Sequence, residues 1–82
     1  METLEAETLR EQVIEITARI TRLSREAIDV YAPFTKLGID SLMALSVVGA
    51  IEKQLKVNIP EKRLRGIKNM SDLVAVIMEG KP

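Results

Sequence analysis

The sequence predicts an all-α fold, a small bundle of three main helices plus one short helix. Apolar residues recur at spacings of three and four in several segments, which is typical of amphipathic helices, and no segment alternates apolar and polar residues as a strand would. The chain has 82 residues and no cysteine, so one aliphatic core must stabilise it without disulfides. We therefore expect a single domain over residues 1–82, without repeats.

The first expected helix occupies the N-terminal quarter of the chain. Its apolar residues follow one another at intervals of four, three, four and three: Leu9, Val13, Ile16, Ile20 and Leu23. This spacing places them on one face of a helix, and the charged residues between them then face solvent.

Residues 24–40 break this pattern and form a long connection. Pro33 interrupts any helix and Gly38 offers a turn position. Apolar residues within the segment are numerous enough to hold it against the core: Ile28, Val30, Phe34 and Leu37. Connections of this length are uncommon in compact domains and are often functional. This one leads directly to Ser41.

The second helix is expected from about residue 41 to 55 and has two faces. The core face consists of Ala44, Val47, Val48, Ile51 and Leu55. The outer face consists of Leu42, Leu45, Ser46, Gly49, Glu52, Lys53 and Lys56, with Met43 and Ala50 at its flank. The leucines of the outer face have two explanations, since either a partner docks on them or the preceding loop covers them.

Two further helices follow. Pro60 suits the start of a short helical turn through Leu64. The last helix is expected to be capped by Ser71 and to end near Gly80, with Leu73, Val74, Ile77 and Met78 as its apolar residues. The expected core then comprises Val13, Ile16, Ile20, Phe34, Val47, Ile51, Leu55, Leu73 and Ile77.

The composition excludes several functional classes. Without histidine or cysteine, a His-based catalytic triad and a thiolate metal site are ruled out, so we predict neither an enzyme nor a metal site. Twelve basic and twelve acidic residues give no net charge to attract nucleic acid or an anionic membrane, and we read the basic stretch 53–68 as a solvated face. No apolar run approaches the ~20 residues of a membrane span, and the N-terminal residues do not resemble a secretory signal. We expect a cytoplasmic monomer.

The segment 37–45, LGIDSLMAL, places Ser41 at the start of the second helix. A short side-chain oxygen there can accept a hydrogen bond from a free amide of the first turn, so Asp40 or Ser41 can be the N-cap. The alternative is that the Ser41 hydroxyl is an attachment point, because a helix N-terminus favours a bound anion. Gly38 permits the tight backbone before the helix.

LGIDSLMAL resembles the modification motif of acyl carrier proteins and of the carrier domains of polyketide and peptide synthases. The order of the amphipathic helix, the long loop with Phe34, the motif and the later proline agrees with that family. The resemblance implies that Ser41 carries 4′-phosphopantetheine, donated by coenzyme A, whose thiol holds acyl groups as thioesters for polyketide or fatty acid biosynthesis. It implies that Asp40 takes part in the modification. Gly38 and Leu42 also belong to the cofactor site, which Ile39 and Leu42 flank.

The resemblance also implies partners: a phosphopantetheinyl transferase, and an acyltransferase, ketosynthase or acyl-activating enzyme. We expect them to bind Leu42, Met43, Leu45, Ser46 and Gly49. Because Glu52 is the one acidic residue of this helix, recognition is expected to rest on apolar contact more than on charge, which is closer to polyketide synthase carriers. Apolar stripes at helical spacing form the protein core in the first place, so we make no prediction that the acyl chain is buried there. The alternatives are an unmodified helical interaction module and a peptidyl or aminoacyl carrier domain.

Overall fold

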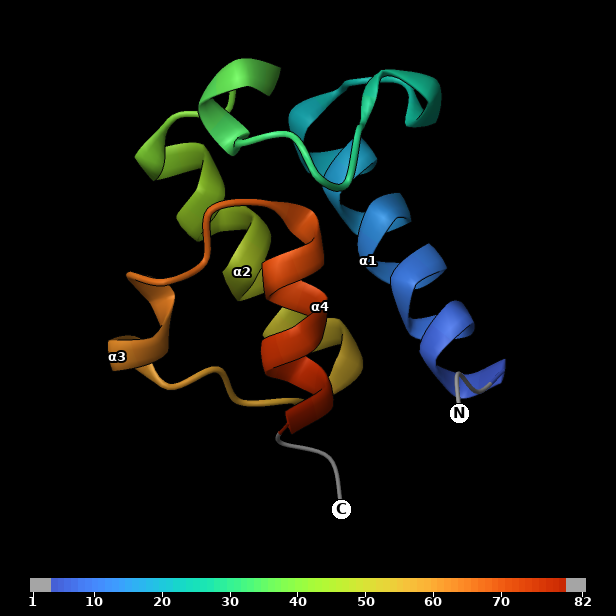
Figure 1. Cartoon of the computed structure of the whole chain (residues 1–82), viewed down its shortest axis with the longest axis vertical. Coiled ribbons are helices and arrows are strands. Elements are labelled where there is room, and N and C mark those ends of the chain that lie inside the picture. The colour runs from blue at the N-terminus through green and yellow to red at the C-terminus, as the bar shows by residue number, and fades with distance from the viewer. Residues whose placement is uncertain (1–3, 80–82) are drawn as a thin grey trace.

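The computed structural model describes residues 4–79 and confirms the all-α fold, with no strand in that range. The helices are α1 (Leu4–Thr21), α2 (Ser41–Leu55), α3 (Glu61–Leu64) and α4 (Met70–Glu79). Helix α1 packs against both α2 and α4. The short α3 lies on the side of the molecule opposite α1 (Figure 1). The predicted bounds of the second helix are confirmed, because its apolar stripe is long and strongly periodic.

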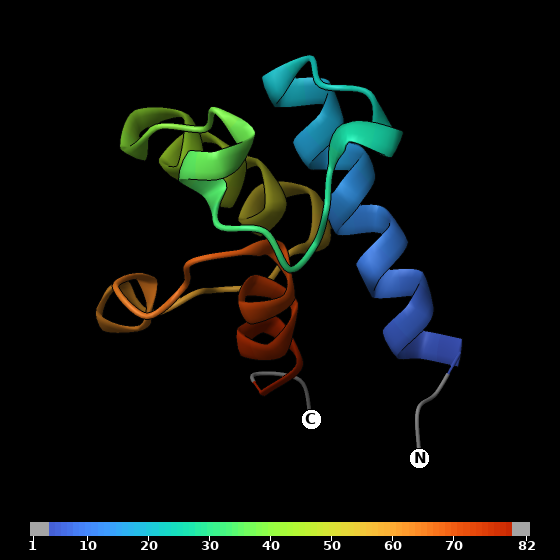
Figure 2. The same cartoon turned by 45° about the horizontal axis from the view of Figure 1, so that its top comes forward.

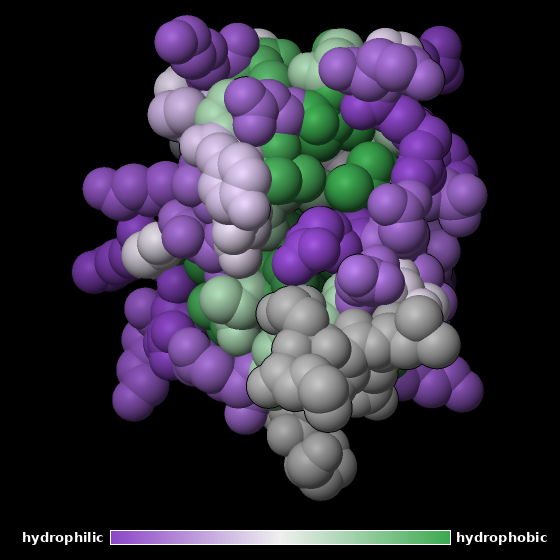
Figure 3. Space-filling view, turned by 45° about the vertical axis from the view of Figure 1, so that its right-hand side comes forward, coloured by the Kyte–Doolittle hydropathy of each residue, from purple (hydrophilic) through white to green (hydrophobic). Residues whose placement is uncertain are grey.

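The three long helices share one aliphatic core. Most of the expected core residues are buried: Val13, Ile16, Val47, Ile51, Leu73 and Ile77. Ile20, Phe34 and Leu55 are half-buried and pack against the edge of the core. On one face of the molecule, hydrophobic residues are visible in the centre with hydrophilic residues around them (Figure 3). The bundle is therefore held by side chains from segments far apart in sequence.

A polar residue that the sequence pattern does not single out lies inside this core. Thr17 is fully buried on α1, and its hydroxyl lies 2.8 Å from the carbonyl oxygen of Val13 and 3.4 Å from the sulfur of Met70. Donation to the helix carbonyl satisfies the hydroxyl and removes the cost of burying it. Met70 is also fully buried, and it occupies the first turn of α4.

The expectation that Ser71 caps the last helix is wrong. Helix α4 begins at Met70, and the side-chain oxygen of Asn69 accepts a hydrogen bond from the amide of Asp72 at 2.7 Å. The Ser71 amide instead donates to the carbonyl of Val30 in the long connection, at 2.9 Å. Asn69 is thus the N-cap, because its position relative to the first turn lets its short side chain reach the third helical amide. The predicted stop of this helix, Gly80, lies outside the described residues.

The long connection is fixed to the region just before α4. It contains two 3₁₀ turns, Arg25–Ala27 and Phe34–Leu37. The Phe34 amide donates to the Lys68 carbonyl at 2.9 Å, and Ile28 is buried in the core. The path of the connection between α1 and α2 is seen in Figure 2. These contacts set where the chain enters α2.

Replacement of each of two glycines by alanine should change the free energy of unfolding in opposite directions. Gly38 has φ +80°, a left-handed conformation that costs an alanine about 1–2 kcal/mol, so Gly38→Ala should lower the free energy of unfolding by about that amount. Gly49 lies inside α2, and an added Cβ there would meet no atom within 4 Å, so Gly49→Ala should raise it by about 0.5–1 kcal/mol. Urea unfolding measures both. Equal effects of the two substitutions would contradict these assignments.

Candidate functional site

The first turn of α2 separates the roles of Asp40 and Ser41. Asp40 is the N-cap, with extended backbone, and its carboxylate accepts a hydrogen bond from the Met43 amide at 2.8 Å. Ser41 is the first helical residue, is exposed, and its hydroxyl forms no hydrogen bond with any residue between 4 and 79. Because Asp40 already caps the helix, the Ser41 hydroxyl has no structural task there and is accessible to another molecule.

The position of Ser41 suits a covalently attached anion. The first amides of a helix lack intrahelical acceptors, and the helix dipole places partial positive charge at this end. Helix α2 has no acidic residue in its first turn. An anion at such an exposed site gains about 0.3–1 kcal/mol. The residues present therefore fit a phosphodiester on Ser41.

The backbone before Ser41 is held in place. Gly38 ends the 3₁₀ turn, and its amide donates to the Thr35 carbonyl at 3.1 Å. The next amide, of Ile39, donates to the Phe34 carbonyl at 2.9 Å. The Ile39 side chain is buried next to the exposed Asp40 and Ser41. This anchor, which sequence reasoning treats only as a flanking position, fixes the direction of the first turn.

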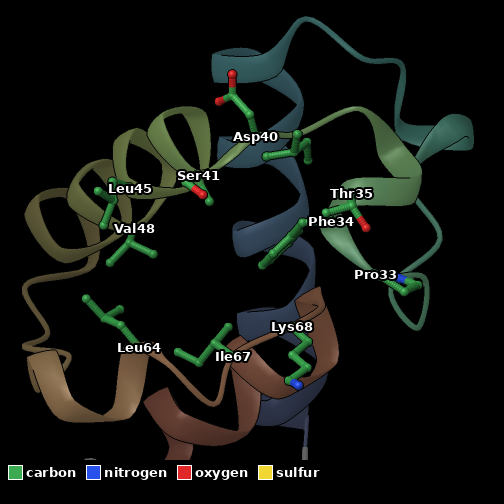
Figure 4. A pocket seen from close by; sticks show the side chains of 12 residues that line it. Pro33, Phe34, Thr35, Asp40, Ser41, Leu45, Val48, Leu64, Ile67 and Lys68 are labelled. Atoms are coloured by element: carbon green, nitrogen blue, oxygen red, sulfur yellow. The ribbon is translucent and has the colours of Figure 1, made fainter.

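A cavity of about 450 Å³ lies beside Ser41 (Figure 4). Its walls come from the 3₁₀ turn before the motif, from α2 and from the segment 64–68. The lining is largely apolar, with Pro33, Phe34, Ile39, Ala44, Leu45, Val48, Leu64 and Ile67, and it includes the polar residues Thr35, Asp40, Ser41 and Lys68. This cavity could not be predicted from the sequence, because residues 34, 48 and 67 share no periodic pattern.

The segment that contains α3 is hydrogen-bonded to both α2 and α4. Arg63 forms two hydrogen bonds with the Glu79 carboxylate of α4, at 2.5 and 3.0 Å. The bond to Arg63 lowers the pKa of the Glu79 carboxyl, and the same contact raises the pKa of Arg63. On the other side, Glu52 accepts a hydrogen bond from the Ile59 amide at 2.9 Å. Glu52 is half-buried, and its carboxylate holds the backbone of this segment. Its assignment to the solvated outer face is therefore wrong.

The outer face of α2 near Ser41 is apolar and uncovered. Leu42 is 76% exposed, Leu45 is 55% exposed and Met43 is 37% exposed, so the explanation that the loop covers the two leucines is wrong. Ser46 and Gly49 are exposed on the same helix. Leu45 also lines the cavity, so this apolar surface and the cavity are continuous at Ser41.

Two substitutions of Asp40 can separate its role as the helix N-cap from the effect of its negative charge. Asp40→Ala removes the cap and should destabilise the fold by about 1 kcal/mol, whereas Asp40→Asn keeps an oxygen acceptor and should be nearly neutral. Unfolding measurements check this pair. The rate at which a phosphopantetheinyl transferase, the partner that the resemblance implies, modifies each variant then tests the charge, since a loss of rate in both variants indicates the carboxylate itself. Full activity of Asp40→Asn would limit Asp40 to capping.

Other kinds of site are not seen in the described part of the chain. Residues 4–79 contain no group of three or more Asp or Glu side chains that could hold a metal ion. No helix within that range is long and apolar enough to cross a membrane. The exposed Ser41 hydroxyl and the neighbouring cavity are therefore the features that demand a functional explanation.

Comparison with known proteins identifies the family of this chain. Residues 11–77 match the family model described as a phosphopantetheine attachment site. An acyl carrier protein of Rickettsia bellii strain RML369-C is 32% identical over 76 residues, which cover 92% of this chain and 88% of that protein. An acyl carrier protein homolog of Ureaplasma parvum serovar 3 is 47% identical over 38 residues, covering 46% of this chain and 49% of that protein. With its helical bundle, this chain belongs to the acyl carrier protein family, whose members are non-catalytic carriers with covalent phosphopantetheine.

Proposed function

We propose that Ser41 is the residue that carries the 4′-phosphopantetheine arm, and that the protein carries acyl intermediates for polyketide or fatty acid biosynthesis. The observation that supports this most strongly is the exposed Ser41 hydroxyl, which is left free at a helix N-terminus because Asp40 is the cap. Ser24, Ser46 and Ser71 do not share this position.

The attachment reaction follows from the chemistry of a primary alcohol. The Ser41 oxygen attacks the phosphorus that bears the pantetheine of coenzyme A, and the bond from that phosphorus to the bridging oxygen breaks. Adenosine 3′,5′-bisphosphate leaves, and the hydroxyl proton passes to a base of the transferase. Ser41 contributes the nucleophile, and the first turn of α2 stabilises the phosphodiester. Once attached, the arm supplies a thiol for acyl thioesters.

The cavity beside Ser41 gives the arm and its cargo a place against the protein. Its apolar walls, including Phe34, Val48 and Ile67, would remove part of an acyl chain from water, at about 25 cal/mol for each Å² of apolar surface buried. We therefore include partial shelter of the cargo in the proposal, which the sequence did not lead us to predict. A rise in thioester hydrolysis in an Ile67→Asp variant that circular dichroism shows to be folded would support shelter, because Ile67 is a half-buried residue of the cavity wall. An unchanged hydrolysis rate would exclude it.

Partner enzymes are proposed to dock on the apolar outer face of α2. This surface, called the docking face below, consists of Leu42, Met43, Leu45, Ser46 and Gly49. Large exposed leucines next to a reactive residue are typical of an interaction surface. The proposed partners are the phosphopantetheinyl transferase and the acyltransferase, ketosynthase or acyl-activating enzyme. The monomeric state and the cytoplasmic location stay predictions, checked by light scattering and cell fractionation.

Mass spectrometry tests the proposed attachment directly. The protein is incubated with coenzyme A, Mg²⁺ and a broad-specificity phosphopantetheinyl transferase, and its mass should rise by one phosphopantetheine group. Peptide mapping should place the group on Ser41. No mass increase would favour the unmodified interaction module, and a group on another serine would refute the Ser41 assignment. The mass of the protein isolated from its own cells then reports the cargo, and an aminoacyl group would indicate a peptide synthase carrier.

A further inference from the structure

Exposed basic residues lie at the cavity wall and along α2. We propose that they select partner enzymes whose contact surface carries carboxylates, which adds a role for charge to the mainly apolar recognition expected from the sequence. This inference rests on the proposed carrier function, because it concerns the surface that a partner must approach to reach Ser41. The basic residues are called the basic rim and consist of Lys53, Lys56, Arg65 and Lys68. Each of them is exposed.

The structure brings the basic rim close to the docking face from two directions. Lys53 lies seven residues beyond Ser46, about two helical turns, so it extends the docking side of α2. Lys68 lines the cavity across from Ser41 (Figure 4). Arg65 directly follows Leu64, another residue of the cavity wall. A partner that covers the docking face and the mouth of the cavity therefore meets these cations.

The side chains of the basic rim form no ion pair within residues 4–79. The ion pairs among residues 4–79 are Arg19–Glu15, Arg25–Glu11 and Arg63–Glu79, and none involves the rim. The nearby carboxylates accept hydrogen bonds from backbone amides: Glu52 from Ile59, Asp72 from Lys68 at 3.0 Å, and Asp40 from Met43. Glu61 is the other acidic residue between positions 34 and 68.

The charge of the whole chain is divided between two regions. Residues 34–68, which include α2 and the cavity walls, contain seven basic and three acidic residues and have a net charge of +4. The remaining residues contain five basic and nine acidic residues and have a net charge of −4. The zero net charge of the sequence is thus the sum of a positive segment, which contains Ser41, and negative segments before and after it. The field of the positive segment attracts a negatively charged partner surface and repels a basic one.

Nucleic acid is the other anion that such cations could attract, and the surface near the rim suits it less. Proteins that bind single strands stack bases on exposed aromatic side chains. Phe34 is half-buried in the cavity wall, and the exposed Tyr31 lies in the long connection. The docking face instead offers aliphatic side chains, which suit a protein partner with apolar contacts at its centre and charges at its rim.

The test begins with a photoreactive p-benzoylphenylalanine in place of Ser46, which is exposed in the middle of the docking face. Proteins cross-linked in the source cells are identified by mass spectrometry, purified and titrated with the carrier at several salt concentrations. We expect Arg65→Glu/Lys68→Glu to weaken affinity at low salt by about tenfold, and the loss to shrink as salt rises. Lys53→Glu, on α2 and away from the α3 wall, should weaken it independently. Reversing the facing carboxylates of the partner to lysine should restore binding.

The matched control is Arg19→Glu/Arg22→Glu, which changes the net charge equally near the C-terminal end of α1. This control variant should change the affinity of the carrier for the partner by less than about twofold. Equal or tighter binding by the rim variants, or salt-independent affinity, would overturn the proposal. So would binding of labelled single-stranded RNA or duplex DNA that the rim variants lose, because the rim would then be a nucleic-acid site. Uptake of the arm from coenzyme A is measured separately, so failure of the carrier function is distinguishable from failure of the charge proposal.

Discussion

Ser41→Ala should abolish uptake of phosphopantetheine while leaving the fold intact. The substitution removes the hydroxyl proposed to form the phosphodiester, so no arm should attach, and every later step of acyl transfer should be lost with it. The fold should survive because Ser41 is exposed, its hydroxyl forms no hydrogen bond with the described residues, and alanine is a good helix former. Intact mass after incubation with coenzyme A and transferase measures uptake, and circular dichroism checks the fold.

Ser46→Ala is the control for this experiment. Ser46 lies five residues further along the same helix and is also exposed, but it is far from the helix start. The Ser46→Ala variant should take up one phosphopantetheine arm, as the protein without the substitution does. The position of Ser46 on the docking face can slow the reaction. Labelling of Ser41→Ala, or loss of all labelling in Ser46→Ala with normal uptake in Ser41→Ala, would falsify the assignment of Ser41.

Ile51→Ala should cause the largest loss of stability among simple truncations of α2. Ile51 is 0% exposed and is among the largest fully buried side chains of the core. Removing three carbon atoms there forfeits their burial and leaves a cavity, which together cost about 2–5 kcal/mol. Domains are stable by only about 5–15 kcal/mol, so the variant would lose much of its margin. Urea unfolding monitored by circular dichroism measures the difference.

Gln54→Ala provides the comparison on the same helix. Gln54 is exposed, so its truncation should change the free energy of unfolding by less than about 0.5 kcal/mol. A loss of that small size in Ile51→Ala as well would mean that the two faces of α2 are assigned incorrectly.

The local features of this protein could be predicted from the sequence. Periodicity is a property of neighbouring residues, so Val13, Ile16 and Ile20 indicate α1 without knowledge of its partners. The helix over residues 41–55 and its outer face follow in the same way. The motif at Ser41 also depends on a few consecutive residues. The motif therefore indicates the family without knowledge of the fold, and the family match over residues 11–77 confirms it.

Choices between neighbouring residues could not be made from the sequence. Asp40 and Ser41 are both short oxygen-bearing residues at a helix start, and only the backbone geometry shows that Asp40 reaches the Met43 amide. Likewise Asn69, and not Ser71, caps α4, because the Ser71 amide is held by the Val30 carbonyl of a distant segment. Such choices depend on distances of a few ångströms that contacts across the fold determine.

By itself the sequence determined the helices, the carrier family and the candidate serine, because each is written in consecutive residues. Tertiary structure alone decided that Leu42 and Leu45 are uncovered, that a cavity opens beside Ser41 and that Lys68 lies across it. The physical reason is that burial, cavities and electrostatic fields are sums over atoms brought together by packing. Residues 34, 48 and 67 line one cavity only after α2, the long connection and the segment before α4 have folded against one another.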